Sequence, residues 1–226
     1  MMMNLFSIFD PSTSNHTALN WLSSLIPFLL FPYMFWITPS RYTFLWNNLL
    51  LIKLFNEFKL LLNKINSMNS IMFISMFTLI LINNFMGLFP YIFTSSSHMI
   101  FSLSLALPMW ITFMLYGWIT NTNHMLAHMV PNGTPPILIP LMIIIENISN
   151  IIRPGTLAIR LTANMIAGHL LITLLSSTGN SKSMNSILLM LMISSQCILM
   201  ILEMSVSIIQ SYVFSILSTL YSNETN

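Results

Sequence analysis

The stretch Arg153–Leu171 reads RPGTLAIRLTANMIAGHLL, and it places two arginines inside an apolar run that extends from residue 137 to residue 175. A charged side chain at membrane depth costs several kcal/mol, so it is rarely present without a function. Arg160 has apolar neighbours on both sides, Ile159 and Leu161. Because arginine does not lose its proton in a protein, we expect Arg160 to act as a fixed positive charge and not as a proton carrier.

Helical periodicity predicts what surrounds Arg160. At about 100° per residue, His169 lies on the opposite side of the helix. The Arg160 face carries pairs of small residues four positions apart, a pattern that lets a second helix approach closely. An alternative is an arginine that extends to a lipid head group, but Arg160 lies far from either end of the run. The residues that share its face are Thr156, Ala163, Asn164, Ala167 and Gly168.

Composition indicates a membrane protein. The chain has 226 residues, of which 5% are charged, and its mean hydropathy is +0.80, whereas soluble domains carry about 25% charged residues. Helices and closed barrels are the structures that satisfy the backbone in lipid, and the apolar runs are too long for barrel strands. We therefore expect an all-α integral membrane protein that forms a single polytopic domain over residues 1–226.

The same composition argues against several partners. The formal net charge of +2 is too small to predict nucleic-acid binding. The single cysteine, Cys197, excludes an internal disulfide and argues against a thiolate metal site. His124 and His128 are spaced i, i+4, but they fall in a predicted loop, 120–136, without a third ligand nearby. We expect neither a metal nor a cofactor.

About six helices are predicted, of which five cross the membrane. The second, 42–66, differs from the rest because Lys53, Lys59 and Lys64 recur with other polar residues at helical spacing, which is typical of an amphipathic helix in the membrane interface. The alternative, a span with its polar face toward the bundle, is less favoured because of these three lysines. The five predicted spans cover 19–38, 71–93, 99–119, 137–178 and 184–221.

The last two predicted helices are too long to cross upright. A helix of about forty residues measures roughly 60 Å, about twice the hydrocarbon thickness of a bilayer. Pro154–Gly155 is the predicted bend in the first of them. Because only a short turn separates 137–178 from 184–221, we expect a tilted hairpin.

Lysine and arginine predict the orientation. Most of these residues outside the spans lie in 41–66, which places that segment on the negative, cytoplasm-like side. Counting the crossings puts the N-terminus on the opposite side and the C-terminus on the same side as 41–66.

Ionisable and polar residues recur within the long helices. Glu146, Arg153 and Arg160 are spaced by seven, on nearly one face if the helix is continuous, although Pro154–Gly155 weakens that inference. Each of these residues alone could be a satisfied packing group.

The last helix carries a second polar set. Glu203 and Gln210 lie on one face with Ser207 between them, and His169 can meet this helix because it points away from the Arg160 face. A Glu–His pair at membrane depth suits a proton relay, since both groups exchange protons. Together with Arg160, the pattern indicates a proton route that stops at a fixed cation.

The run Leu157–His169, LAIRLTANMIAGH, resembles the a-subunit family of rotary F-type ATP synthases. Glu203 and Gln210 fall at matching places on the final helix, and Glu146–Pro154, ENISNIIRP, is similar to the segment before the essential arginine of the family. Bacterial members carry Glu at the position of His169 and His at the position of Glu203, so the chain resembles the mitochondrial form. The likeness covers most of the chain from about Leu79 onward.

The resemblance implies a stator subunit of the mitochondrial inner membrane that makes no ATP itself. Its partners would be a rotating ring of small helical-hairpin subunits with buried carboxylates, the peripheral stalk, other membrane-sector subunits, the lipid bilayer and protons. The N-terminus would face the intermembrane space and the C-terminus the matrix. The implied proton-translocation residues are His169 and Glu203 on the inlet side, Glu146 on the outlet side, Arg160 as the separator, and Asn164 and Gln210 beside them.

Two other classes of protein stay open on the residues alone. An ion-coupled secondary transporter would show internal repeats or broken helices in matching halves, and the chain has one Pro-Gly break and no repeat. A redox subunit would need paired histidine ligands on facing helices, which the sequence lacks.

Overall fold

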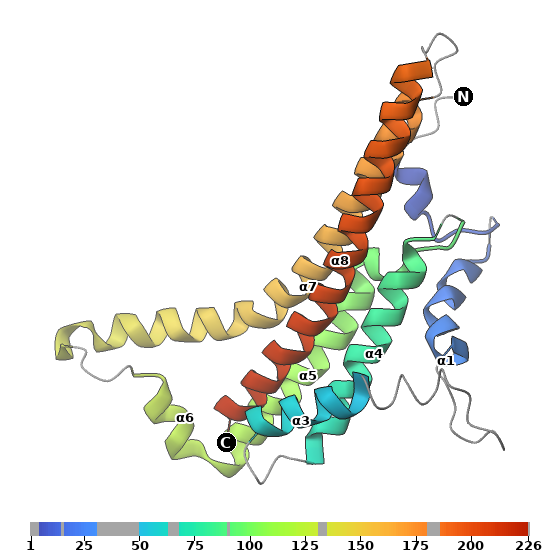
Figure 1. Cartoon of the computed structure of the whole chain (residues 1–226). Coiled ribbons are helices and arrows are strands. Elements are labelled where there is room, and N and C mark those ends of the chain that lie inside the picture. The colour runs from blue at the N-terminus through green and yellow to red at the C-terminus, as the bar shows by residue number, and fades with distance from the viewer. Residues whose placement is uncertain are drawn as a thin grey trace, which may run out of the picture.

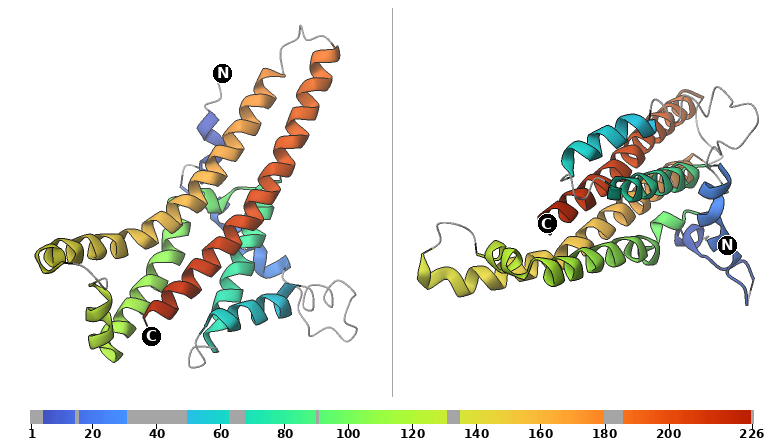
Figure 2. Two further views of the ribbon diagram at one scale, coloured as in Figure 1. Left: turned by 60° about the vertical axis from the view of Figure 1, so that its left-hand side comes forward. Right: turned by 90° about the horizontal axis from the view of Figure 1, so that it is seen from below.

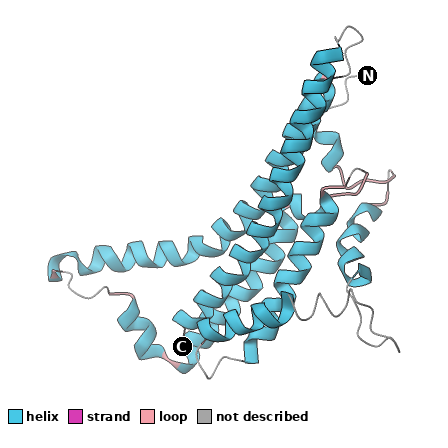
Figure 3. Cartoon of the chain, in the orientation of Figure 1, coloured by secondary structure: helices cyan, strands magenta, loops and turns pink. Residues whose placement is uncertain are grey.

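A computed structural model describes residues 5–14, 16–30, 50–62, 68–89, 91–130, 135–179 and 186–225. Within these ranges the ordered elements are all helices, without a strand (Figure 3). Four of the described helices are long and apolar enough to cross a membrane. The predicted fold class, an all-α integral membrane protein, is confirmed.

The four long helices dominate the molecule. They are α4 (Ser70–Gly87), α5 (Met99–Thr120), α7 (Ile139–Thr178) and α8 (Ser186–Glu224). The last two have 40 and 39 residues and lie side by side (Figure 2). Their upper parts extend beyond α4 and α5 (Figure 1). The two over-long helices of the predicted hairpin are thus present.

The helix α7 curves between its yellow N-terminal arm and its orange C-terminal part (Figure 1). Pro154 lies inside this helix. Proline has no N–H for the bond to residue i−4, and its ring crowds that carbonyl, so it bends a helix without ending it. This is the bend that Pro154–Gly155 predicted.

Several short helices complete the described chain. The predicted first span begins as the 3-10 helix η2 (Leu19–Leu25) and continues into α1 (Ile26–Leu30); its remainder, 31–38, lies outside the described residues. The other short elements are η1 (Leu5–Phe9), α3 (Ile52–Leu61), η5 (Ser95–Ser97), α6 (Thr122–His128) and η6 (Pro136–Leu138).

Two predicted boundaries differ from the structure. The span predicted at 71–93 ends at Gly87, since the following sequence Leu-Phe-Pro brings a proline that cannot donate to a helix. The loop predicted at 120–136 contains α6, because Met125 finds a packing site: its sulfur lies 3.1 Å from the position that a Cβ would take on Gly117.

The described part of the predicted amphipathic segment, α3, has one apolar side. Leu54 and Phe58 are buried, one turn apart, while Lys53 and Lys59 are exposed. Glu57 accepts a hydrogen bond from the Tyr212 hydroxyl of α8 at 3.1 Å. The rest of 42–66, apart from 50–51 and Leu62, lies outside the described residues. The core cluster beneath α3 contains Leu54, Phe58, Leu62, Phe73, Phe77, Leu81 and Met109.

A line of buried serines runs along α8, which packs on both α4 and α7. Ser207, Ser211 and Ser215 are spaced by four and completely buried, and each hydroxyl donates to the carbonyl three residues earlier in its own helix. Small side chains at such spacing allow two backbones to approach without leaving polar groups exposed to lipid. Glu203 lies one turn before Ser207 on this buried side of α8 and is 7% exposed.

The elements gather at two ends. The helices η1 and η5 lie toward the end that carries the close of α7 and the start of α8, whereas α3, α6 and the C-terminus lie at the opposite end (Figure 1). The carboxylates of α7 and α8 divide between these ends: Glu203 lies toward the first, and Glu146 and Glu224 lie toward the second.

Candidate functional site

Arg160 lies on α7 with its side chain exposed. Among the residues that the structure describes, it forms no ion pair and no hydrogen bond. It lines a small hollow with Gln210 of α8, together with apolar side chains such as Leu157 and Phe214. The charge is therefore presented at the surface of the chain, beside one polar residue.

The face around Arg160 is open. Thr156, Ala163 and Ala167 are exposed, while Asn164 and Gly168 are half-buried. Apart from Arg160, these side chains are small or polar. No large side chain projects from this face, so a second helix can come near the guanidinium. The composition of this face agrees with the helical periodicity of the sequence.

Glu203 packs directly on the backbone of α7. A Cβ placed on Gly168 would lie 2.8 Å from Glu203 Oε1 and 2.9 Å from its Cδ. Neither carboxyl oxygen has a hydrogen-bond partner among the described residues. A side chain at position 168 would therefore displace the carboxyl group, because the carboxyl group fills the space that the side chain would occupy.

His169 faces α4 and η1. The backbone of Gly87 is the hydrogen-bonding neighbour of its ring, and the Phe9 ring meets it edge-on at 6.4 Å between centroids. Its Nε2 is buried without a partner in the described ranges. We expected His169 to face α8; instead its neighbour Gly168 meets Glu203, because adjacent residues of a helix point about 100° apart.

A second cluster forms around Arg153 near the C-terminus. One guanidinium nitrogen of Arg153 is paired with Glu224, and the other lies 3.7 Å from Glu146 Oε1. The guanidinium also stands over the Tyr221 ring, 5.2 Å from its centroid. The side chains of Arg153, Glu146 and Glu224 are between 24% and 40% exposed, so the charges are partly solvated.

The sequence analysis missed two residues of these clusters. Glu224 lies three positions beyond the predicted end of the last helix, and only the extra turn of α8 brings it to Arg153. Gly168 was assigned to the Arg160 face, and its contact with Glu203 depends on how α8 packs on α7. The heptad spacing of Glu146 and Arg153, in contrast, did predict that the two share a face.

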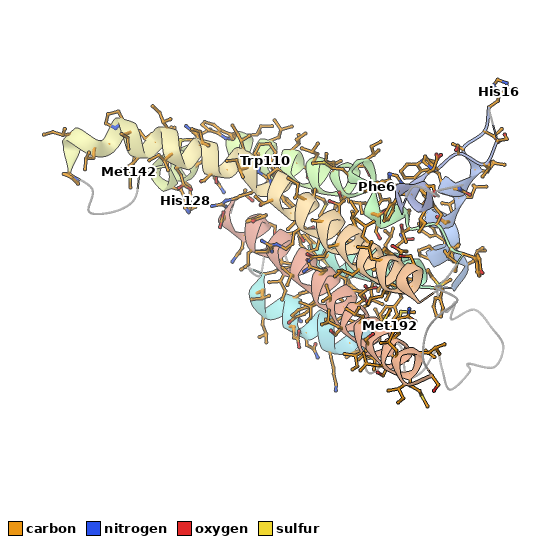
Figure 4. All side chains as sticks on the ribbon, turned by 90° about the horizontal axis from the view of Figure 1, so that it is seen from above. Phe6, His16, Trp110, His128, Met142 and Met192 are labelled. Carbon is orange, nitrogen blue, oxygen red and sulfur yellow. The ribbon has the colours of Figure 1, made fainter. Side chains whose placement is uncertain are left out.

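The histidine pair of α6 lies beside the Arg153 cluster. The rings of His124 and His128 are 6.4 Å apart between centroids. Within the described ranges, no group of three or more His, Cys, Asp or Glu side chains could hold a metal ion. His128 and Trp110, both labelled in Figure 4, line one hollow with Arg153 and Glu224.

Two clusters flank Arg160 along α7: Glu203 with His169 on one side, and Arg153 with Glu146 and Glu224 on the other. At about 1.5 Å per residue, Arg153 lies about 10 Å from Arg160 in one direction, and Gly168–His169 lie about 13 Å away in the other. Carboxylate and imidazole groups exchange protons, whereas the guanidinium does not. The arrangement offers two places where protons can bind, separated by a permanent cation.

Sequence comparisons give a consistent result. The family described as "ATP synthase A chain" matches residues 18–223. Proteins named ATP synthase subunit a are similar over the full length of both chains: 59% identical over 228 residues in Anopheles quadrimaculatus, 60% over 227 in Drosophila melanogaster and 58% over 229 in Aedes aegypti.

Proposed function

The chain belongs to the ATP synthase A chain family, and on that premise we propose that it forms two proton half-channels on either side of Arg160. As a member of this family it is a proton-translocating subunit of the ATP synthase membrane sector, a multi-pass protein of the mitochondrial inner membrane. It associates with other subunits of that sector.

One observation carries the proposal: an exposed arginine without a partner lies between two proton-binding clusters. Protons that reach Glu203 and His169 cannot pass along the Arg160 face, because the described residues place no titratable group on that face between the clusters. The carrier must come from another subunit. A rotating ring of small hairpins, each with a buried carboxylate, would supply it.

The open face of α7 suits such a partner. The small residues Ala163 and Ala167 lie one turn apart, next to Arg160, and are exposed. A passing carboxylate that meets the guanidinium is stabilised in its charged form, so it gives up its proton before it passes. Asn164 and Gln210 flank the same surface and would orient the carboxylate or water there.

The two clusters take different parts in this proposal. His169 contacts Phe9 of η1, and Glu203 contacts the neighbouring Gly168, so both lie toward the η1 end and form the inlet, on the intermembrane-space side. Glu146 lies toward the end that carries the C-terminus and forms the outlet, on the matrix side. The N-terminus then faces the intermembrane space, in agreement with the lysines and arginine of residues 41–66 on the matrix side. The subunit itself carries no catalytic site for ATP, and the peripheral stalk holds it against the turning ring.

The test is reconstitution in vesicles under an imposed membrane potential, with internal pH as the readout. We expect the chain alone to pass no protons, and the chain with the ring and the other membrane-sector subunits to pass them at a measurable rate. The imposed membrane potential supplies about 2.3 kcal/mol for each proton that crosses, per 100 mV. If the chain alone conducts as fast as the assembly, it is a channel or transporter and the stator function is wrong.

A further inference from the structure

A groove of about 630 Å³ lies between α1 and α4. The two helices pack on each other, and α3 packs on α4 beside them (Figure 1). Phe28 of α1, Leu51 directly before α3, and Leu105 of α5 line the groove together with a row of α4 residues. Its volume is in the range of pockets that hold a small organic ligand. The groove lies apart from Arg160 and from both clusters, since none of their residues lines it.

The walls of the groove are apolar. Of the described residues that line it, none is ionisable, and the polar ones are Ser75 and Thr78. Both hydroxyls donate to a carbonyl three residues earlier in α4, that of Ser75 to Met72 at 2.7 Å and that of Thr78 to Ser75 at 2.9 Å. These donors are therefore satisfied without a ligand or water. Apolar cavities of this kind stay dry and take up hydrocarbon instead of water, so the groove suits an apolar ligand.

The length of the groove distinguishes between two kinds of apolar occupant. Its wall on α4 extends from Ile71 to Ile82, a rise of roughly 17 Å along the helix. Half the hydrocarbon thickness of a bilayer is about 15 Å. A partner helix that crosses the membrane needs about 20 residues, which measure about 30 Å. The groove therefore matches an acyl chain in one leaflet, and it is too short for a crossing helix.

A positive charge lies at the α3 end of the groove. Lys53 is exposed and comes two residues after Leu51, which lines the groove. Within the described ranges Lys53 forms no ion pair, and the acidic residue one turn on, Glu57, accepts a hydrogen bond from Tyr212 of α8 at 3.1 Å. An amphipathic helix in the membrane interface attracts anionic lipid head groups through its lysines. The apolar groove and Lys53 together have the chemistry that an anionic phospholipid requires.

We propose that the groove binds an acyl chain of an anionic phospholipid from the leaflet on the α3 side, with the phosphate at Lys53. The inference goes beyond the proposed function, because neither Arg160 nor the two clusters take part in it. The bound chain fills the space between α1 and α4, so the lipid is part of the packing that connects α1 to the long helices.

Photolabelling of the purified, assembled complex tests the site. The probe is phosphatidylglycerol with a diazirine on one acyl chain, and the comparison is phosphatidylcholine with the same chains. After illumination, labelled residues are identified by mass spectrometry of peptides. We expect the stretch of α4 from Ile71 to Ile82 to be labelled about fivefold more by the anionic lipid, which is the effect of one interfacial lysine. Equal labelling by the two lipids would overturn the proposal, and this comparison needs no variant.

Two matched pairs of variants locate the lipid. Lys53→Gln should remove the preference for phosphatidylglycerol, whereas Lys59→Gln, also exposed but about 12 Å along α3 from Leu51, should keep it. Ser75→Trp fills the groove and should abolish labelling of α4. Its control, Ser104→Trp, changes an exposed serine of α5 that bonds to its own helix in the same way and does not line the groove. A preference that survives Lys53→Gln, or labelling that survives Ser75→Trp, means that the lipid does not bind here.

A photoreactive side chain identifies a competing occupant. In Ser75→benzoylphenylalanine, an adduct with the mass of an anionic phospholipid supports the site. An adduct to residues 31–49 of this chain, or to another subunit, shows that a protein segment fills the groove, and the proposal is then wrong. None of these measurements depends on proton flow, so the lipid site and the proposed half-channels can fail separately.

Discussion

The two acidic clusters of α7 and α8 differ in how their carboxyl groups are held. Glu203 is buried against Gly168 with both oxygens unpaired in the described ranges. Glu146 and Glu224 are partly exposed and share the Arg153 guanidinium. Glu203 can therefore take up or release a proton without breaking an ion pair, whereas Glu146 and Glu224 both contact the Arg153 side chain. In the proposed function, Glu203 and His169 serve proton transfer at the inlet, and the Arg153 cluster combines proton transfer at Glu146 with an ion pair that holds the end of α8.

The position of Arg160 between the clusters gives the largest expected effect. Arg160→Lys should reduce proton-driven ATP synthesis about a thousandfold, because lysine can lose its proton when desolvated and lacks the planar fork that meets a carboxylate. ATP synthesis is measured in vesicles that contain equal amounts of assembled complex. Near-normal synthesis would mean that the clusters do not need a permanent cation between them.

Removing the inlet carboxyl tests the contrast directly. Glu203→Gln keeps the shape of the side chain and removes its exchangeable proton, so proton flow should fall about a hundredfold. The matched control is Glu57→Gln, in which the amide oxygen still accepts the Tyr212 hydrogen bond. A similar loss in both variants would show that any change of charge on α3 or α8 disturbs the complex.

Gly168, the residue of α7 that Glu203 contacts, can be changed without altering the carboxyl group itself. Gly168→Ala places a methyl group 2.8 Å from Oε1, so Glu203 must move, and proton flow should fall about tenfold. Gly155→Ala on the same helix meets nothing within 4 Å and should leave flow unchanged while it favours the helix by roughly 0.5–1 kcal/mol. Equal flow in the two variants would mean that the position of Glu203 does not limit the rate.

These clusters also show how far the sequence could go. A charge inside an apolar run predicted a functional role for Arg160, and heptad spacing placed Glu146 beside Arg153, because both signals are local to one helix. The contacts of Glu203 with Gly168 and of Glu224 with Arg153 depend on the rotation and length of α8. That rotation depends on how α8 packs on α4 and α7, which no periodicity within α7 can predict.

Long-range packing explains the other differences as well. The α6 helix forms where a loop was predicted, because Met125 packs against Gly117 of α5. The His169 ring turns to α4 and η1, because the Gly87 backbone and Phe9 are there to meet it. A single face of a helix can be predicted from spacing, but which neighbour covers that face requires the arrangement of all helices.

The smallest expected effect is at the ion pair between Arg153 and Glu224, which holds the end of α8. Glu224→Gln removes one charge of the Arg153 pair, and because the partners are 24% and 40% exposed, the loss of stability should be only about 0.5–1 kcal/mol. Proton flow should stay within about twofold of the parent, since Glu146 keeps its place 3.7 Å from Arg153. A double-mutant cycle with Arg153→Gln, read from unfolding in detergent, measures the coupling. If flow instead falls as far as in Glu203→Gln, Glu224 is part of the proton path, and the contrast between the inlet carboxyl and this ion pair does not hold.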